Sequence, residues 1–164
     1  MKKWLFKALA LLCAVVIHDL NGGAVNAAES QPQNEAAILD TEFPADIEAR
    51  LALSGGPEHI RSGATVYIYR KGKGFQLHRQ GDNGFTCLLN RDSFLYGSAA
   101  FKPTCWDKQG LDSYIPVMLA VGQWLAEGKS AEDVKTLIEQ GFQSDAFKSP
   151  DTTGIAYMVA GDIS

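Results

Sequence analysis

The sequence lacks the short motifs that mark the commonest catalytic sites. It contains no G-x-S-x-G turn, no G-x-G-x-x-G loop, no Gly-Lys-Ser/Thr phosphate loop and no H-E-x-x-H pair. Histidine is scarce, with 3 in 164 residues, and no His or Cys spacing matches a metal site. The 16 glycines and 6 prolines follow no repeat, which excludes a collagen-like chain. We therefore expect no cofactor, no metal and no recognisable catalytic constellation.

Long hydrophobic runs are lacking as well. The apolar run at residues 8–17 is about half as long as the ~20 residues that a membrane-spanning helix needs. Three lysines precede this run and small residues ending at Ala27 follow it, which is the pattern of a secretory signal peptide. We predict that residues 1–27 are removed after Ala27, with Ala24 as the alternative. The protein would then be exported to the periplasm or outside the cell, without a stable membrane anchor.

Loss of this segment changes both the charge and the cysteine count. It removes three lysines and one aspartate, so the mature chain is more acidic than the full chain with its net charge of −4. An acidic protein is a poor candidate for nucleic-acid binding. Cys13 leaves with the signal, and Cys87 and Cys105 remain. In an oxidising compartment they predict a disulfide worth about 3 kcal/mol. The alternative is a reactive Cys87 with His78 as its base.

The chain length suits one domain of the α+β class. The polar residues 28–43 predict a flexible linker, and residues 44–164 a single domain. β-branched and aromatic residues at 65–70, with turn residues at 71–74 and 82–84, predict a three-stranded antiparallel meander over 65–90. Helical spacing predicts a hairpin of two helices on one face of the sheet, and a last strand returning to it. The remaining ranges are a helix at 45–53, helices from Asp112 or Ser113 to 127 and from Ser130 to 141, and a strand at 154–160.

One face of the predicted meander is a candidate ligand site. Pairing Arg70 with Phe75 would set the register of the first hairpin, and alternation would then place Val66, Ile68, Phe75 and Leu77 in the core. The opposite face would carry two aromatic rings amid hydrogen-bonding groups, which suit stacking on a flat ligand or sugar. An ordinary solvated sheet face has the same composition. The candidate ligand-binding residues are Tyr67, Tyr69, Gln76 and His78.

Two other surfaces are candidates for partner binding. The hairpin loop carries Arg70, Lys71 and Lys73, which suit an anionic partner, or else a solvated turn that protects a sheet edge. The irregular segment 91–110 holds four aromatic residues that either anchor an interface or cover the edge of the sheet. These four interaction candidates are Phe94, Tyr96, Phe101 and Trp106.

Three motifs stand out as a set: NGFTC at 83–87, PTCWD at 103–107 with Gly110 after it, and GIAYM at 154–158. Together they resemble motifs of an uncharacterised family of small exported bacterial proteins, over roughly residues 44–160. The resemblance implies export and a single domain. It implies no activity, ligand or catalytic residue.

The sequence favours a non-enzymatic, exported binding or interaction domain that takes a small ligand or an envelope protein. One alternative is a small hydrolase of envelope polymers, with an acid and a base drawn from His59, His78 and Asp107. Another is a structural or regulatory partner of an envelope protein. The sequence does not specify the oligomeric state or the identity of any ligand.

Overall fold

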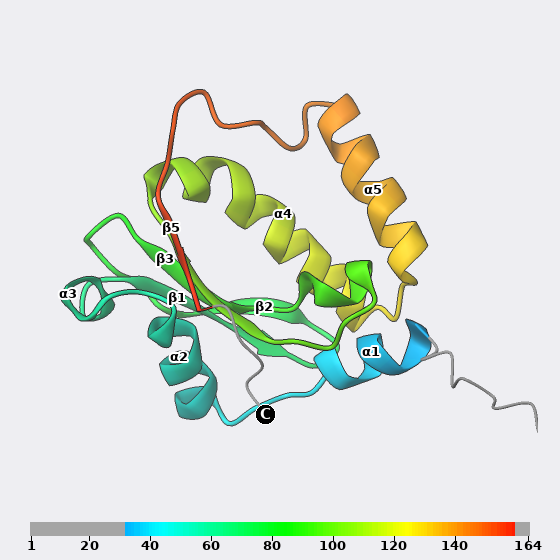
Figure 1. Ribbon diagram of the computed structural model, residues 1–164, viewed down its shortest axis with the longest axis horizontal. Coiled ribbons are helices and arrows are strands. Elements are labelled where there is room, and N and C mark those ends of the chain that lie inside the picture. Colours follow the sequence, from blue (N-terminus) through cyan, green and yellow to red (C-terminus); the bar gives the residue numbers. More distant parts are fainter. Residues whose placement is uncertain (1–31, 160–164) are drawn as a thin grey trace, which may run out of the picture.

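The computed structural model describes residues 32–159 and shows an α+β fold. A five-stranded sheet lies between helices on both of its faces (Figure 1). The predicted signal peptide at 1–27 lies outside the described residues, as do residues 160–164. In chain order the elements are α1 (Pro32–Leu39), α2 (Ala45–Ser54), α3 (Glu58–Arg61), β1 (Thr65–Arg70), β2 (Gly74–Arg79), β3 (Thr86–Asn90), the 3-10 helix η1 (Asp92–Tyr96), β4 (Lys102–Trp106), α4 (Lys108–Ala126), α5 (Ala131–Gln143) and β5 (Ala156–Met158).

The sheet is mixed, and the predicted antiparallel meander is wrong. The strand order is β2-β1-β3-β4-β5, with β1 parallel to β3 and every other pair antiparallel. Residues 80–85 do not form a hairpin but cross the start of β1, where the backbone N–H groups of Asp82 and Asn83 both donate to the Gly63 carbonyl. Gly81 permits this crossing, because a Cβ there would lie 2.1 Å from the Gly63 oxygen. The chain therefore places β3 on the far side of β1 from β2.

The register of the first hairpin differs by one residue from the prediction. Arg70 pairs with Gly74 and Tyr69 with Phe75, because the turn closes one residue earlier and Gly74 adopts a φ of +65°. Since side chains alternate between faces, this shift moves Phe75 and Leu77 to the face of the tyrosines. A bulge between Val66 and Tyr67 follows further along the ladder.

Each face of the sheet has its own buried cluster. Facing α2 are Val66, Ile68 and the two cysteines of the sheet, Cys87 and Cys105, packed against Ala49, Ala52 and Ile60. Facing α4 are Tyr69, Phe75, Leu88 and Trp106, packed against Val117, Val121 and Leu125. The second predicted helix, α5, contacts η1 and α4 rather than the sheet. Burial on both sides explains why the middle of β1, residues 66–69, and the middle of β3, residues 87–89, are apolar or aromatic.

The N-terminal caps of the two longest helices, α4 and α5, can be compared with the cap residues that the sequence predicts. Ser130 caps α5 as predicted, because its Oγ accepts a hydrogen bond from the Asp133 N–H at 3.1 Å. The predicted start of the preceding helix at Asp112 or Ser113 is wrong. Asp107 caps α4 five residues before Asp112, so that Pro116 lies inside the helix instead of in its first turn. No helix within residues 32–159 is long and apolar enough to cross a membrane.

Four elements fall where no regular structure is predicted, one of them the single-turn helix α3. Residues 32–39 of the predicted linker form α1, and Leu39 is fully buried. The irregular segment 91–110 contains η1 and the whole of β4. β4 is short and contains Pro103, a residue that argues against a strand inside a sheet. The Pro103 carbonyl nevertheless accepts a hydrogen bond from the Val159 N–H.

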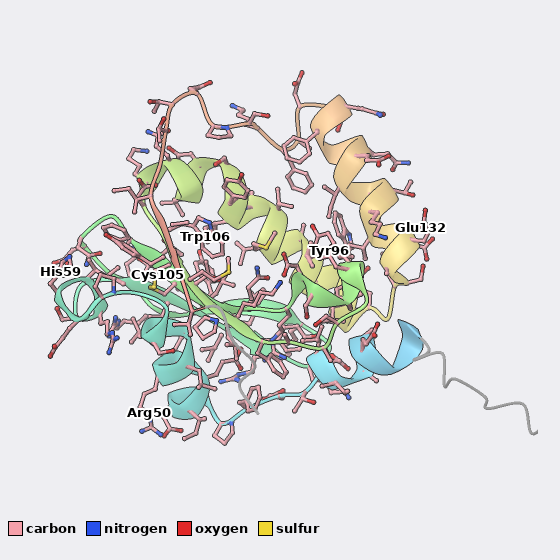
Figure 2. All side chains as sticks on the ribbon, in the orientation of Figure 1. Arg50, His59, Tyr96, Cys105, Trp106 and Glu132 are labelled. Atoms are coloured by element: carbon pink, nitrogen blue, oxygen red, sulfur yellow. A yellow bond between two sulfur atoms is a disulfide. The ribbon has the colours of Figure 1, made fainter. Side chains whose placement is uncertain are left out.

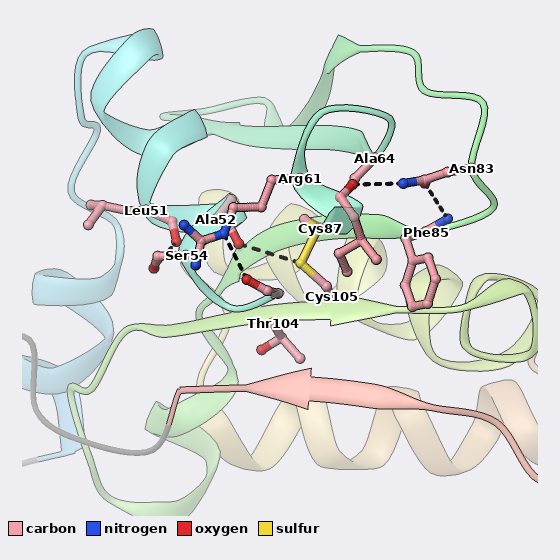
Figure 3. The surroundings of a disulfide bond; sticks show 12 residues. Leu51, Ala52, Ser54, Arg61, Ala64, Asn83, Phe85, Cys87, Thr104 and Cys105 are labelled. Carbon is pink, nitrogen blue, oxygen red and sulfur yellow. Dashed lines mark hydrogen bonds between the residues drawn. A yellow bond between two sulfur atoms is a disulfide. The ribbon is translucent and has the colours of Figure 1, made fainter. Parts of the chain in front are cut away.

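The predicted disulfide is confirmed. Cys87 on β3 and Cys105 on β4 lie directly opposite each other, and their sulfur atoms are 2.02 Å apart (Figure 3). Both residues are fully buried beneath α2, where Cys105 Sγ lies 3.8 Å from the Ala52 carbonyl oxygen. Gly55 lets α2 approach so closely, since a Cβ there would be 2.6 Å from the backbone of Pro103. The alternative of a reactive Cys87 is therefore wrong.

Candidate functional site

The four candidate ligand-binding residues do not share an exposed face. Tyr69 is fully buried, and its hydroxyl donates to Asp40 Oδ1 at 2.6 Å. Burial, followed by this hydrogen bond, raises the pKa of the Tyr69 hydroxyl well above its ordinary value. Tyr67 is half-buried against the core, and only Gln76 and His78 are exposed. Two stacked tyrosine rings are thus not available on this surface.

A fully buried ion pair, which the sequence analysis missed, lies beside Tyr69. Arg91 donates to Glu48 Oε1 at 3.0 Å and to the carbonyls of Leu39 and Thr41. Both charged side chains are 0% exposed. Desolvation lowers the pKa of Arg91, and the attraction of Glu48 opposes that shift. No sequence signal marked this pair, because Arg91 simply follows a strand and Glu48 lies in a helix of ordinary composition.

Aromatic rings complete the surroundings of this ion pair. The Arg91 guanidinium lies over the rings of Tyr69, Phe101 and Phe43, with distances to the ring centroids of 4.2, 4.9 and 5.7 Å. We call Glu48, Arg91 and these three rings the arginine cluster. Its contacts join the segment between α1 and α2 to β1 and the end of β3. Every partner is internal, so the cluster is a structural device.

The basic hairpin loop also finds partners within the chain. Arg70 lies 3.7 Å from Glu42, and Lys71 Nζ lies 3.1 Å from Asp40 Oδ2. The Lys71 backbone N–H donates to Glu42 as well. Internal carboxylates thus neutralise most of this loop, and it needs no anionic partner from outside.

The four aromatic residues of segment 91–110 separate into different environments. Phe94 and Trp106 are 1% and 6% exposed and belong to the core. Phe101 packs edge-on against Phe43 with ring centroids 5.2 Å apart. Only Tyr96 is widely exposed, at 75%, in a shallow hollow that it shares with Glu132 (Figure 2).

The residues suggested for a hydrolase are not brought together. His59 lies on α3 at the opposite end of the molecule from Tyr96 (Figure 2). His78 lies on β2, whereas Asp107 follows β4, and two strands separate β2 from β4. At about 4.8 Å between neighbouring strands, that separation is about 14 Å. Among residues 32–159 no cluster of His, Cys, Asp and Glu is arranged to hold a metal ion.

An open groove lies between the first turns of α4 and the segment 148–156, which leads from α5 to β5. Its volume is about 210 Å³, and Trp106 and Gly110 line it together with Tyr114 and Ile155. Gly110 is required here, because a Cβ would lie 2.4 Å from Trp106 Cβ. A smaller hollow of about 110 Å³ continues from it to Phe142 and shares Tyr114 and Pro150. We call these two hollows together the docking groove.

Three exposed side chains of the docking groove are large and apolar, and they lie beside the smaller Thr152 and Thr153 and the charged Lys148. Tyr114, Phe142 and Ile155 are 53%, 41% and 53% exposed, although they come from three different segments. Small-molecule pockets usually enclose about 300–1,000 Å³. Each of the two hollows is smaller than this and open to solvent, so each fits one bulky side chain of a partner better than it encloses a free ligand.

Asp107 fastens the segment 148–156 to α4. Its Oδ1 accepts from the N–H groups of Gln109 and Gly110 at 3.0 and 3.1 Å, and its Oδ2 accepts from the Ile155 N–H at 2.7 Å. Partial burial alone would raise the pKa of Asp107. The three hydrogen bonds together have the larger effect, so the pKa of this carboxyl group lies below its ordinary value. The carboxylate therefore has a positioning role: it forms one end of the groove.

The docking groove could have been suspected in part from the sequence. Trp106, Asp107 and Gly110 were singled out there as a motif, and Gly154–Met158 as another, without any indication that they meet. Comparison of the chain with protein-family models, curated proteins and solved structures finds no match. The assignment of a function therefore rests on the geometry of the chain itself.

Proposed function

We propose that this protein is an exported, non-enzymatic interaction domain that binds an extended segment of another protein in the docking groove. The observation that carries the proposal is the convergence of Tyr114, Phe142 and Ile155 around two open hollows, each of which is below the usual volume of a small-molecule pocket. Exposed apolar side chains that gather on one surface usually mark a protein contact.

The chemistry of the groove defines the expected partner. Tyrosine and tryptophan dominate the binding energy of protein interfaces, especially where a rim of polar groups surrounds them. Here Trp106 forms part of the floor, and Thr152, Thr153 and Ser113 supply polar atoms at the sides. A partner segment with one aromatic or large aliphatic side chain would place that side chain beside Tyr114.

Export supports a partner in the cell envelope or outside the cell. The disulfide joins two central strands, which suits a protein that folds in an oxidising compartment. The N-terminal lysines, the short apolar run and the small residues before Ala28 match the pattern of a secretory signal peptide, which would direct the export. The mass of the protein purified from a periplasm, without reduction, tests this part of the proposal and would correspond to residues 28–164.

Selection of displayed peptides tests the binding site. Random 12-residue peptides would be selected on the exported, disulfide-bonded protein, and we expect the enriched sequences to share an aromatic or large aliphatic residue. Tyr114→Ser should weaken binding of a selected peptide at least about tenfold, which corresponds to about 1.4 kcal/mol. Tyr96→Ser is the matched control, because Tyr96 is also an exposed ring and lies outside the groove, at 75% exposed against 53% for Tyr114. Equal loss in both variants, or no loss in Tyr114→Ser, would contradict the proposed site.

A further inference from the structure

The outer edge of β5 has no neighbouring strand in the described part of the chain. β5 is the last strand in the order and pairs only with β4 (Figure 1). Residues 152–159 carry no charge, and Ile155, Met158 and Val159 are 53%, 52% and 42% exposed. Sheet edges are normally protected by charges, prolines, bulges or a covering segment, since a bare edge pairs with another strand. Within the described residues β5 has no charge, proline or bulge, and its only protection is its length of three residues.

The opposite edge of the sheet makes the contrast clear. β2 carries Gln76, His78 and Arg79 and contains the irregular register opposite Val66 and Tyr67. These features charge that edge and interrupt its register. Of the two sheet edges in the described part of the chain, β5 therefore presents the uncharged row of backbone groups.

The hydrogen bonds of β5 show which of its groups are free. The Asp107 N–H donates to the Ile155 carbonyl, and the Val159 N–H donates to the Pro103 carbonyl. In an antiparallel pair, the N–H and C=O of one residue point to the same neighbour, and those of the next residue point away from it. Residues 155, 157 and 159 therefore face β4. Ala156 and Met158 direct their N–H and C=O groups outward.

We propose that the open edge of β5 pairs antiparallel with β5 of a second copy of this chain, about a twofold axis at Tyr157. In this register Ala156 lies opposite Met158 of the other copy, and the reverse, so that the outward donors and acceptors of both residues are satisfied. The small Ala156 faces the large Met158 on one side of the sheet. On the other side Ile155 faces Val159, and the two Tyr157 rings are neighbours.

Charge and symmetry favour a second copy as the occupant. Two copies of an acidic chain repel each other, and this uncharged segment brings no like charges into opposition. A twofold contact requires a self-complementary patch, which the exchange of Ala156 and Met158 provides. The result is a continuous sheet across both copies. Because so short a strand buries less than the ~1,200 Å² of a standard interface, the dimer is weak and dissociates on dilution.

Sedimentation equilibrium of the exported protein, from about 20 µM to about 1 mM, tests the pairing. The average mass of the wild type should rise from one chain toward two. Met158→Pro and Ala156→Pro should each keep the protein monomeric at every concentration. Each proline removes an N–H that faces outward and bonds to nothing within β4 and β5, so the fold is kept, as the thermal unfolding midpoint will show. Met158→Lys is a third monomeric variant that leaves the backbone donor in place.

Two controls distinguish this contact from the docking groove. Met158→Val keeps the N–H and an apolar side chain, and it should dimerise like the wild type. Tyr114→Ser should also dimerise like the wild type, because Tyr114 lies in the groove and outside β5. A wild type that stays monomeric throughout, or a dimer that survives in both proline variants, would overturn the inference whatever the fate of peptide binding.

Discussion

The arginine cluster and the docking groove contain similar kinds of side chain and differ in what surrounds them. In the cluster, three aromatic rings and the chain's own carbonyls enclose a charged pair that is completely buried. In the groove, Tyr114 and Phe142 are half exposed and no segment of the described chain covers them. The buried ion pair, which is the more unusual feature, thus belongs to the arginine cluster and stabilises the fold. The candidate for binding is the region whose apolar side chains the chain leaves about half exposed.

The largest expected effect is on stability and comes from breaking the ion pair. Arg91→Ala would leave Glu48 buried without its partner, which typically costs about 3–5 kcal/mol. Chemical denaturation should show this loss. Replacing both residues, as Glu48→Leu with Arg91→Met, should recover part of it, because no buried charge remains but the Tyr69 N–H loses its acceptor, Glu48 Oε1. A single variant as stable as the wild type would contradict the structural role of the cluster.

Removal of the disulfide comes next. The double variant Cys87→Ala with Cys105→Ala should lower the free energy of unfolding by about 2–4 kcal/mol. Both positions are fully buried in the cluster that faces α2, whereas Tyr114 lies on α4 on the other face of the sheet, so a selected peptide should still bind to whatever fraction is folded. Loss of binding in the folded fraction would show that the disulfide supports the docking groove, which would contradict our account.

Asp107 offers a smaller change, at the end of the groove itself. Asp107→Ala removes the cap of α4, which costs about 1 kcal/mol, and it also releases the Ile155 N–H. Hydrogen exchange of the Ile155 amide should become faster, while the amides of the core strands change little. Slow exchange at Ile155 in this variant would show that the carboxylate does not fasten the segment 148–156.

The same carboxylate predicts a pH dependence with a definite sign. The pKa of Asp107 is lower in the folded protein than its ordinary value, so its contribution to stability is complete above about pH 4 and is lost as the pH falls through the folded pKa. Asp107→Asn should therefore show a smaller drop in stability between about pH 4 and pH 2 than the wild type does. Equal drops would assign the acid sensitivity to other groups.

The smallest expected effect on stability belongs to the groove. Tyr114→Ser and Phe142→Ser change exposed side chains, so unfolding should shift by no more than about 0.5 kcal/mol. Both should nonetheless weaken peptide binding. A large loss of stability in Tyr114→Ser would mean that its ring supports the fold, and the contrast with the arginine cluster would fail.

Local signals in the sequence predicted much of the secondary structure. The β-branched and aromatic run of β1, the breaker after α2 and the Ser130 cap of α5 each act through nearby residues, and each was read correctly. The disulfide also followed from cysteine number and compartment. Topology was predicted less well, because Asp82-Asn83-Gly84 suits a hairpin and a crossing turn equally, and only Gly81 against Gly63 decides between them.

The candidate site was less accessible to sequence reasoning, for a physical reason. Alternation along β1 correctly placed Tyr67 and Tyr69 on one face, but it could not show that α4 covers that face. The docking groove requires three segments that are far apart in sequence to meet: the start of α4, the end of α5 and the approach to β5. The position of β4 brings them together. The sequence did not reveal β4, because Pro103 argues against a strand inside a sheet.

The central claim is that partners bind beside Tyr114. Titration of a selected peptide into isotopically labelled protein, followed by backbone amide chemical shifts, tests it most directly. The account predicts that the largest changes map to residues 106–114, to Phe142 and to residues 150–156. Changes that map instead to Tyr96 and residues 130–135 would place the interaction surface at the opposite end of α4 and contradict the account.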